Sequence, residues 1–487
     1  DRFTSRAMIE TEQRLHRAAD ATAVNTKHSV SDAQRNAAFA NAAKRGLVLS
    51  GEQKSAFEHV TNSKGLALVV GYAGTGKSAM LGVAREAWES AGYTVRGAAL
   101  SGIAAEGLEN GSGIASRTIA SLEHQWGKGR EQLTARDVLV IDEAGMVGTR
   151  QMERVLSHAA KADAKVVLVG DQQQLQAIEA GAAFRAIHER HGGVEISEVR
   201  RQLSAWQQDA TRHLATGRTG EAIRTYAERG MVHAAGTREV ARTALIERWD
   251  KERQASPDDS RIILTHTNDE VRELNQMARG KMRATGALGG DATIKALRGD
   301  RQFASGDRII FLRNERGLGV KNGTLGTVAM ASAQSMAVRT DDGREVAFDT
   351  KDYAHIDHGY AATIHKAQGM TVDRAHVLAT RGMDSHSAYV AMSRHREGLA
   401  LHYGRDDFAD QSKLVRTLSR ERGKDMAGDY KPEKAFAELR GISFRERIME
   451  MVRQVPEKAK SIFGNFRPQA RQLEPLPAQT NTQNDQR

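Results

Sequence analysis

A glycine-rich loop between an apolar run and a helical pattern is the clearest chemical signal in the sequence. Residues 71–78 read GYAGTGKS, which fits the pattern G-x-x-x-x-G-K-[ST]. Its glycines let the backbone curl so that successive N–H groups point at phosphate oxygens, and the following helix adds its positive end. We expect Lys77 to reach the β- and γ-phosphates of a nucleotide, and the Ser78 hydroxyl to bind Mg²⁺. The nucleotide-binding residues predicted here are Gly71, Gly74, Thr75, Gly76, Lys77 and Ser78.

Two further apolar runs end in residues suited to the same chemistry. The run VLVIDEAGM carries Asp142, which we expect to hold Mg²⁺ beside the phosphates, and Glu143, which is suited to polarise an attacking water. A hydrolase needs such a base, whereas a transferase has reason to exclude water. After the run KVVLVGD, Gln174 is placed where a neutral amide can sense the γ-phosphate. The simpler alternatives are a glycine turn, an acidic helix cap and a solvated glutamine turn.

The elements that must position these residues follow an alternating pattern. Short continuous apolar runs, each typical of a buried parallel strand, mostly precede helical stretches, which indicates a doubly wound α/β fold, formed twice. Residues 303–349 differ, because short strands there are separated by glycine turns without helices, and a small inserted β-barrel is the natural interpretation. The predicted strands are 67–71, 95–100, 138–142, 165–170, 261–265, 376–380 and 399–404.

Composition narrows the class of protein. The net charge of +10 and pI near 9.7 favour a nucleic-acid partner, although arginines spread over a solvated surface would give the same numbers. The chain has no cysteine, which fits a reducing cytoplasm, and no run of 18 apolar residues, so we expect no membrane insertion. The 17 histidines show no metal-ligand spacing. His355 and His358 could face one way on a helix, but we favour a plain surface pair.

Taken in order, further motifs resemble those of superfamily 1 helicases of the RecD-like branch, over about residues 47–405. LSGEQKSAF is similar to the adenine-reading Q motif and implicates Gln53, while EVRRQ and YVAMSRHREGLAL place Arg201 and Arg394 as arginine fingers. GYAATIHKAQGMTVD is similar to motif V, which implies that Gly369 contacts nucleotide. The resemblance implies DNA contacts at Ser101, Gly102, Thr118, Asn322, Thr363 and His365. We expect Lys321, at the barrel tip, to be a further phosphate contact. Trp126, Tyr360 and His365 are candidates for base stacking, against core packing as the alternative.

The resemblance implies two RecA-like parallel-sheet motor domains, with the small β-barrel inserted in the second. The closest likeness is to the helicase portion of TraA/TraI-type conjugative relaxase–helicases. The domain boundaries predicted on this basis are 1–45 for a helical linker or the end of a preceding domain, 46–203 for the first motor domain, 204–302 and 356–405 for the second, 303–355 for the barrel, 406–465 for C-terminal helices and 466–487 for a disordered tail.

The function implied is ATP- and Mg²⁺-dependent translocation on single-stranded DNA, with 5′→3′ polarity and unwinding of a duplex fork during conjugative plasmid transfer. The implied partners are DNA, a relaxase domain in the same longer chain and the conjugation machinery, and the expected state is a monomer. Closure of two lobes would bring the distant arginines to the nucleotide. A DNA-loading module with weak or no ATPase is the alternative; intact Lys77, Asp142 and Arg394 argue against it. A P-loop phosphotransferase would leave the last two motifs unexplained.

Overall fold

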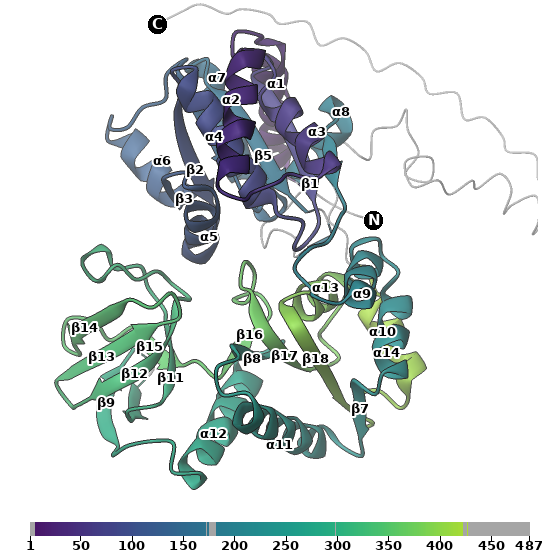
Figure 1. Cartoon of the computed structure of the whole chain (residues 1–487), viewed down its shortest axis with the longest axis vertical. Coiled ribbons are helices and arrows are strands. Elements are labelled where there is room, and N and C mark those ends of the chain that lie inside the picture. Colours follow the sequence, from purple (N-terminus) through teal and green to yellow (C-terminus); the bar gives the residue numbers. More distant parts are fainter. Residues whose placement is uncertain (1–4, 172, 175–181, 298, 422–425, 427–487) are drawn as a thin grey trace, which may run out of the picture. The chain divides into compact units, whose positions relative to one another are not determined.

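A computed structural model describes residues 5–171, 173–174, 182–297, 299–421 and 426. The expected helices in 432–463 and the expected disordered tail at 466–487 lie outside the described residues. Among the described helices, none combines the length and apolar character needed to cross a membrane. The described chain contains two parallel sheets, a five-stranded antiparallel sheet and a two-stranded antiparallel hairpin (Figure 1).

The first sheet has six strands, all parallel, in the order β3-β2-β4-β5-β1-β6. Its central strands are continuous apolar runs because they are covered on both faces. In β1, for example, Leu66 and Leu68 pack into one hydrophobic core, whereas Ala67 and Val69 pack into another. The strands are β1 Leu66–Gly71, β2 Thr94–Ala99, β3 Ser116–Thr118, β4 Asp137–Ile141, β5 Lys165–Gly170 and β6 Val194–Ile196.

Helices on both faces of this sheet include three that precede the glycine loop in sequence, α1, α2 and α3. Helix α1 packs along α7 and buries Leu15 and Ala19, while α2 packs against α4 and buries Ala38 and Ala42. The segment 6–44 thus contributes to the cores of the first sheet. The helices are α1 Arg6–Val24, α2 Asp32–Lys44, α3 Gly51–Val60, α4 Lys77–Ser90, α5 Gly102–Ser112, α6 Ile119–Gly127, α7 Thr149–Lys161 and α8 Ala183–His191, with a short 3-10 turn η1 at Ala144–Met146.

The second parallel sheet has five strands in the order β16-β8-β17-β18-β7. Its two faces pack into separate cores, one of which includes the fully buried Tyr389 of α13. The strands are β7 Val232–Ala235, β8 Arg261–Thr265, β16 Ala361–Thr363, β17 Val372–Leu378 and β18 His395–Gly404. The helices are α9 Ala205–Ala215, α10 Thr219–Glu228, α11 Arg238–Ala255, α12 Asn268–Ala284, α13 Ser385–Met392 and α14 Gln411–Leu418.

A five-stranded antiparallel sheet, ordered β14-β13-β12-β11-β15, lies between β8 and β16 in the sequence. The hairpin β9–β10 adds Ile294 and Phe303 to the same hydrophobic core. In the described residues no pairing joins β14 to β15, so closure into a barrel stays a prediction. The elements are β9 Ala292–Ala296, β10 Gly299–Phe303, β11 Arg308–Phe311, β12 Leu325–Ala331, β13 Ser335–Thr340, β14 Glu345–Asp349, β15 Ile356–His358 and the 3-10 turn η2 Arg316–Leu318.

The structure confirms the predicted α/β fold with a parallel sheet beside the glycine loop. Each of the seven predicted strands overlaps an observed strand, and those in the first sheet agree to within about one residue. The strand expected at 376–380 instead runs over Val372–Leu378. That the second parallel sheet serves as a motor domain stays a prediction, as do the domain boundaries.

Candidate functional site

The glycine loop joins the end of β1 to the start of α4 in a conformation that needs glycine. Gly74 and Gly76 have φ values of 80° and 74°, in the left-handed region that other residues rarely adopt. Space is also limiting. A Cβ added at Gly76 would lie 2.5 Å from Gln53 Nε2, and one at Gly74 would lie 2.5 Å from Arg201 Cβ. Side chains from two other segments are therefore packed directly on this loop.

Lys77 and Gln53 hold the loop through its carbonyl groups. The Lys77 ammonium donates to the Gly71 carbonyl at 2.6 Å and to the Tyr72 carbonyl at 3.1 Å. Gln53 lies in the first turn of α3, where it completes a capping box with Ser50. Its buried amide donates to the Thr75 carbonyl at 2.9 Å. The predicted adenine-reading residue thus braces the loop, and the predicted phosphate-binding lysine lies over it.

The acidic pair lies immediately after β4. The Asp142 side chain is buried and accepts a hydrogen bond from the Glu143 backbone N–H at 2.9 Å. Burial, and next the charge of Glu143, raise the pKa of the Asp142 carboxyl to about 6, against an opposing effect of Lys77. Glu143 itself has a φ of 51°, and its carboxylate accepts from the Gln368 amide at 3.5 Å. The backbone turn at Glu143 therefore makes the carboxylates of Asp142 and Glu143 point in different directions.

These residues fit a magnesium ion. Mg²⁺ prefers hard oxygen ligands, and a buried carboxylate destabilised by its surroundings gains most from a nearby cation. Asp142 is such a carboxylate, and the partly buried Ser78, second residue of α4, supplies a hydroxyl. Among the described residues, no group of three or more histidine, aspartate or glutamate side chains could hold a metal ion.

A second buried carboxylate, Asp171, follows β5. It accepts from the Gln174 amide at 3.1 Å and from the Tyr389 hydroxyl at 2.7 Å. Burial raises the pKa of Asp171, whereas Lys77 and these hydrogen bonds lower it. The predicted sensor Gln174 is thus bonded to a carboxylate at the end of β5. Residues 175–181, which follow Gln174, lie outside the described residues.

The two predicted finger arginines lie together at the end of α13, although 192 residues separate Arg201 from Ser393. Arg201 donates to the Ser393 carbonyl at 2.8 Å. The fully buried Arg394 donates to the Val390 carbonyl at 2.9 Å and to the Ser393 hydroxyl at 2.8 Å. Burial, and next the charge of Arg394, lower the pKa of Arg201 to about 9. Two cations held on neutral acceptors form a site that an anion would stabilise.

Three of the predicted DNA-contacting residues lie near the loop that carries Asn322. Ser101 and Thr118 cap the N-termini of α5 and α6. A cavity of about 350 Å³ is lined by Gly102 of α5, by Thr118 of β3, and by Asn314 and Lys321 from the connection between β11 and β12. Asn322 is exposed beside it, and its backbone N–H donates to Asn314 at 2.8 Å. This cavity is the candidate DNA contact.

The motif V residues lie elsewhere. Thr363 ends β16 and is buried, with its hydroxyl accepting from the Lys366 N–H at 3.4 Å, while His365 is exposed. Gly369 has a φ of 82° and a backbone that approaches Ala104 of α5. The structure does not place Thr363 or His365 in the cavity that Thr118 lines, and the nucleotide contact expected at Gly369 stays a prediction.

The base-stacking predictions for Trp126 and Tyr360 are wrong, because both side chains lie in hydrophobic cores. Trp126 stacks on His158 with ring centroids 4.2 Å apart and donates to the Glu131 carbonyl. Tyr360 is fully buried, and its hydroxyl donates to Asp307 at 2.7 Å. The alternative of core packing therefore holds for both. The prediction that His355 and His358 form a plain surface pair is also wrong. His358 lies on a strand and is half-buried, and its ring nitrogen lies 3.0 Å from the Gln302 carbonyl.

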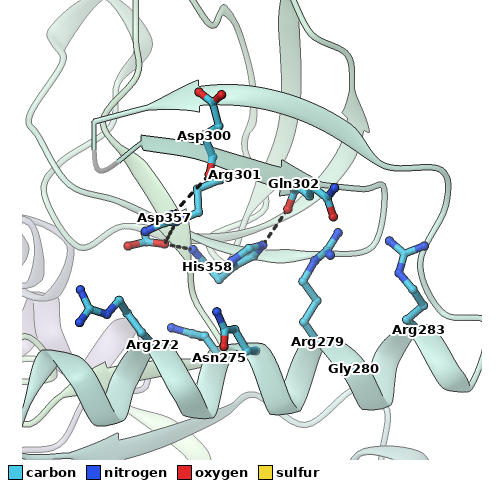
Figure 2. Close-up of a pocket in the computed structure, with 11 residues that line it drawn as sticks. Arg272, Asn275, Arg279, Gly280, Arg283, Asp300, Arg301, Gln302, Asp357 and His358 are labelled. Carbon is cyan, nitrogen blue, oxygen red and sulfur yellow. Dashed lines mark hydrogen bonds and ion pairs between the residues drawn. The ribbon is translucent and has the colours of Figure 1, made fainter.

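A second cavity, of about 670 Å³, lies between α12 and the strands β10 and β15 (Figure 2). Figure 2 shows arginines of α12 pointing toward these strands. Each arginine that lines this cavity is paired with an aspartate, and Arg279 links α12 to Asp307, directly before β11. The pairs are Arg272 with Asp269, Arg279 with Asp291 and Asp307, Arg283 with Asp291, and Arg301 with Asp357.

Sequence reasoning missed Tyr389 and His386, which lie one turn apart on α13. The His386 ring lies 2.9 Å from the Gln173 carbonyl, and the Tyr389 hydroxyl lies 2.7 Å from Asp171. The available signal was a tyrosine five residues before Arg394 within the apolar run AYVAM, where a hydroxyl needs a partner.

Comparisons with known proteins show what this chain is similar to. Residues 48–237 match the family described as the AAA domain. The chain is 44% identical, over 472 residues and 93% of its length, to the "Probable conjugal transfer protein TraA" of Sinorhizobium fredii, of which it spans 42%. It is 26% identical, over 67% of its length, to the "ATP-dependent RecD2 DNA helicase" of Deinococcus radiodurans, of which it covers 44%.

Among solved structures, the fold is similar to that of the Pif1 helicase from Bacteroides in complex with ADP-AlF3 and ssDNA. The TM-score is 0.52 at 18% sequence identity, and the match covers 77% of this chain and 95% of that one. At this identity the likeness shows the fold alone. By its motifs and its relatives, the chain is therefore a RecD-like superfamily 1 sequence that corresponds to part of the TraA-type proteins.

Proposed function

We propose that this chain is an ATP-dependent DNA helicase that translocates on single-stranded DNA, in the 5′→3′ direction, and unwinds DNA during conjugative plasmid transfer. One observation carries the proposal. Side chains from the second parallel sheet and its helices, among them Arg394, Tyr389 and Gln368, lie against the glycine loop and the carboxylates that follow β4 and β5.

That arrangement suits a hydrolysis reaction whose groups are divided between two sheets. The loop N–H groups and Lys77 would bind the phosphates, and Glu143 would orient and deprotonate the attacking water. Arg201 and Arg394 would stabilise charge that develops on the γ-phosphate. Ser78 and Asp142 would hold Mg²⁺, which when bound neutralises phosphate charge.

The same residues link hydrolysis to movement. Lys77 donates to loop carbonyl groups, and Arg394 donates to the Val390 carbonyl of α13. Each side chain must therefore exchange hydrogen-bond partners when a triphosphate binds. A bound triphosphate would stabilise the new positions of both residues at once, and loss of the γ-phosphate would remove that stabilisation. Alternation between two relative positions of the sheets, with DNA contacting both, would move the strand.

DNA binding is proposed at the cavity beside Thr118 and Lys321. Two helix N-termini point there, and these favour phosphate oxygens. The role in conjugation is proposed from the TraA relatives, of which this chain spans less than half. A relaxase domain in the same longer chain, and the 5′→3′ polarity, belong to this proposal as well.

The decisive experiment measures ATP hydrolysis with and without single-stranded DNA, followed by unwinding of duplexes with a 5′ or a 3′ tail. We expect strong stimulation by DNA, and unwinding of the 5′-tailed duplex. Lys77→Ala should abolish hydrolysis while keeping most DNA affinity. DNA binding without turnover in the unaltered protein would instead show a loading module, and turnover indifferent to DNA would exclude a DNA motor.

A further inference from the structure

The apex of the phosphate loop is packed into the second parallel sheet's core. Ala73 is 2% exposed and belongs to the hydrophobic cluster that contains Tyr389, Val390 and Met392 of α13. Tyr72 packs against the same cluster. The loop that would bind the nucleotide is thus in contact with the helix that leads to Arg394.

One hydroxyl group joins this loop apex to the carboxylate after β5. The Ala73 backbone N–H donates to the Tyr389 hydroxyl at 2.7 Å, and that hydroxyl donates to Asp171 Oδ2 at 2.7 Å. A tyrosine hydroxyl has one proton to give, so the direction of both bonds is set. All three groups are buried, which makes each bond costly to lose.

The same carboxylate also receives the Gln174 amide, and the neighbouring Gln173 carbonyl is held by His386 of α13. Helix α13 thus grips the segment after β5 at two points one turn apart. Arg394 follows two residues after the end of this helix and is bonded back to it through the Val390 carbonyl. A shift of α13 therefore moves Arg394 and strains the Tyr389 bonds together.

We propose that Tyr389 is a positioning residue that couples the phosphate loop and the Gln174 segment to the helix bearing Arg394. The inference rests on the proposed ATPase function and deepens it. Tyr389 contacts neither nucleotide nor metal in this role. Because Ala73 N–H is already engaged by the hydroxyl, it is not among the donors available to phosphate. Loss of the hydroxyl should then impair turnover more than nucleotide binding.

The test is Tyr389→Phe, which keeps the ring in the core and removes only the hydroxyl. Tyr403→Phe is the matched control, because Tyr403 is 4% exposed, lies in the same cluster and packs on Phe408. With saturating single-stranded DNA, we expect kcat for ATP hydrolysis to fall about tenfold in Tyr389→Phe, with KM changed by less than about threefold. Tyr403→Phe should keep both constants.

A second measurement does not depend on activity. Hydrogen exchange in the nucleotide-free protein should be faster in the peptide covering residues 70–80 of Tyr389→Phe, since the Ala73 N–H loses its acceptor. Unchanged exchange there, an unchanged kcat, or an equal fall in kcat in Tyr403→Phe would each overturn the inference. If the unaltered protein does not hydrolyse ATP, the proposed function fails, while exchange still decides whether Tyr389 holds the loop.

Discussion

His395 gives the sharpest quantitative prediction, because it is fully buried directly after Arg394. Burial, and next the charges of Arg201 and Arg394, lower its pKa from 6.5 to about 3. Between these values the unfolded chain binds a proton at this position and the folded chain does not. Stability is therefore fully present at neutral pH and is lost as pH falls below the unfolded pKa.

The magnitude follows from the difference between the two pKa values. At about 1.5 pH units below the unfolded pKa, that is at pH 5.0, protonation stabilises the unfolded state by about 1.36 kcal/mol per pH unit. This histidine alone therefore lowers the free energy of unfolding by about 2 kcal/mol relative to pH 7.5. His402, whose pKa is also lowered to about 3 by burial and next by His233, adds a similar loss. Acid should thus destabilise the second parallel sheet and the arginine site together.

The assay is urea unfolding at pH 7.5 and pH 5.0, which measures the free energy of unfolding of the second parallel sheet at each pH. His395→Gln removes the titrating group, while its amide can still meet the Tyr226 hydroxyl that lies 3.1 Å from His395 Nε2. This variant should lose about 2 kcal/mol less than the unaltered protein on acidification. His124→Gln, which changes an exposed histidine, is the control and should keep the full loss. An equal loss in His395→Gln would refute the reasoning.

Four further predictions concern the site. Arg394→Ala should bind a fluorescent ATP analogue normally but hydrolyse ATP about 10³-fold or more slowly; loss of binding would contradict a finger role. Gly76→Ala should abolish nucleotide binding in the same titration, because its φ of 74° and the nearby Gln53 amide both oppose a methyl group. Trp126→Ala should lower the free energy of unfolding by about 3–5 kcal/mol, while filter binding shows unchanged DNA affinity of the folded protein. Titrations of DNA at several salt concentrations should give a straight line of log affinity against log salt with a steep negative slope, whereas a flat line would exclude phosphate contacts.

The local parts of the site were predictable because local rules determine them. A buried parallel strand must be apolar throughout, and a loop that wraps phosphate needs glycine where φ is positive, as Gly74 and Gly76 show. The nearness of Lys77 to the carboxylates after β4 and β5 follows from parallel strands whose ends share one edge of a sheet.

The remaining features depend on packing between distant segments, which no short pattern encodes. An aromatic residue such as Trp126 or Tyr360 suits a stacked base and an apolar core equally well, so only the fold separates the two. The Tyr389 hydroxyl bonds to Ala73, which is 316 residues away in the sequence, and to Asp171, which is 218 residues away. Arg279 of α12 pairs with Asp291 and Asp307, which lie 12 and 28 residues further along the chain, so the sequence of the helix alone does not show how this charge is neutralised.

The packing of α1 on α7 bears on how the molecule can be divided for study. A fragment cut at residue 46 would uncover the surface on which Leu15 and Ala19 lie, and would leave Glu153 and Arg190 without their partners Arg14 and Asp20. An exposed apolar strip of this kind promotes aggregation. Expression vectors meant to yield the isolated nucleotide-binding region should therefore begin before Arg6, so that the first helix is retained whole.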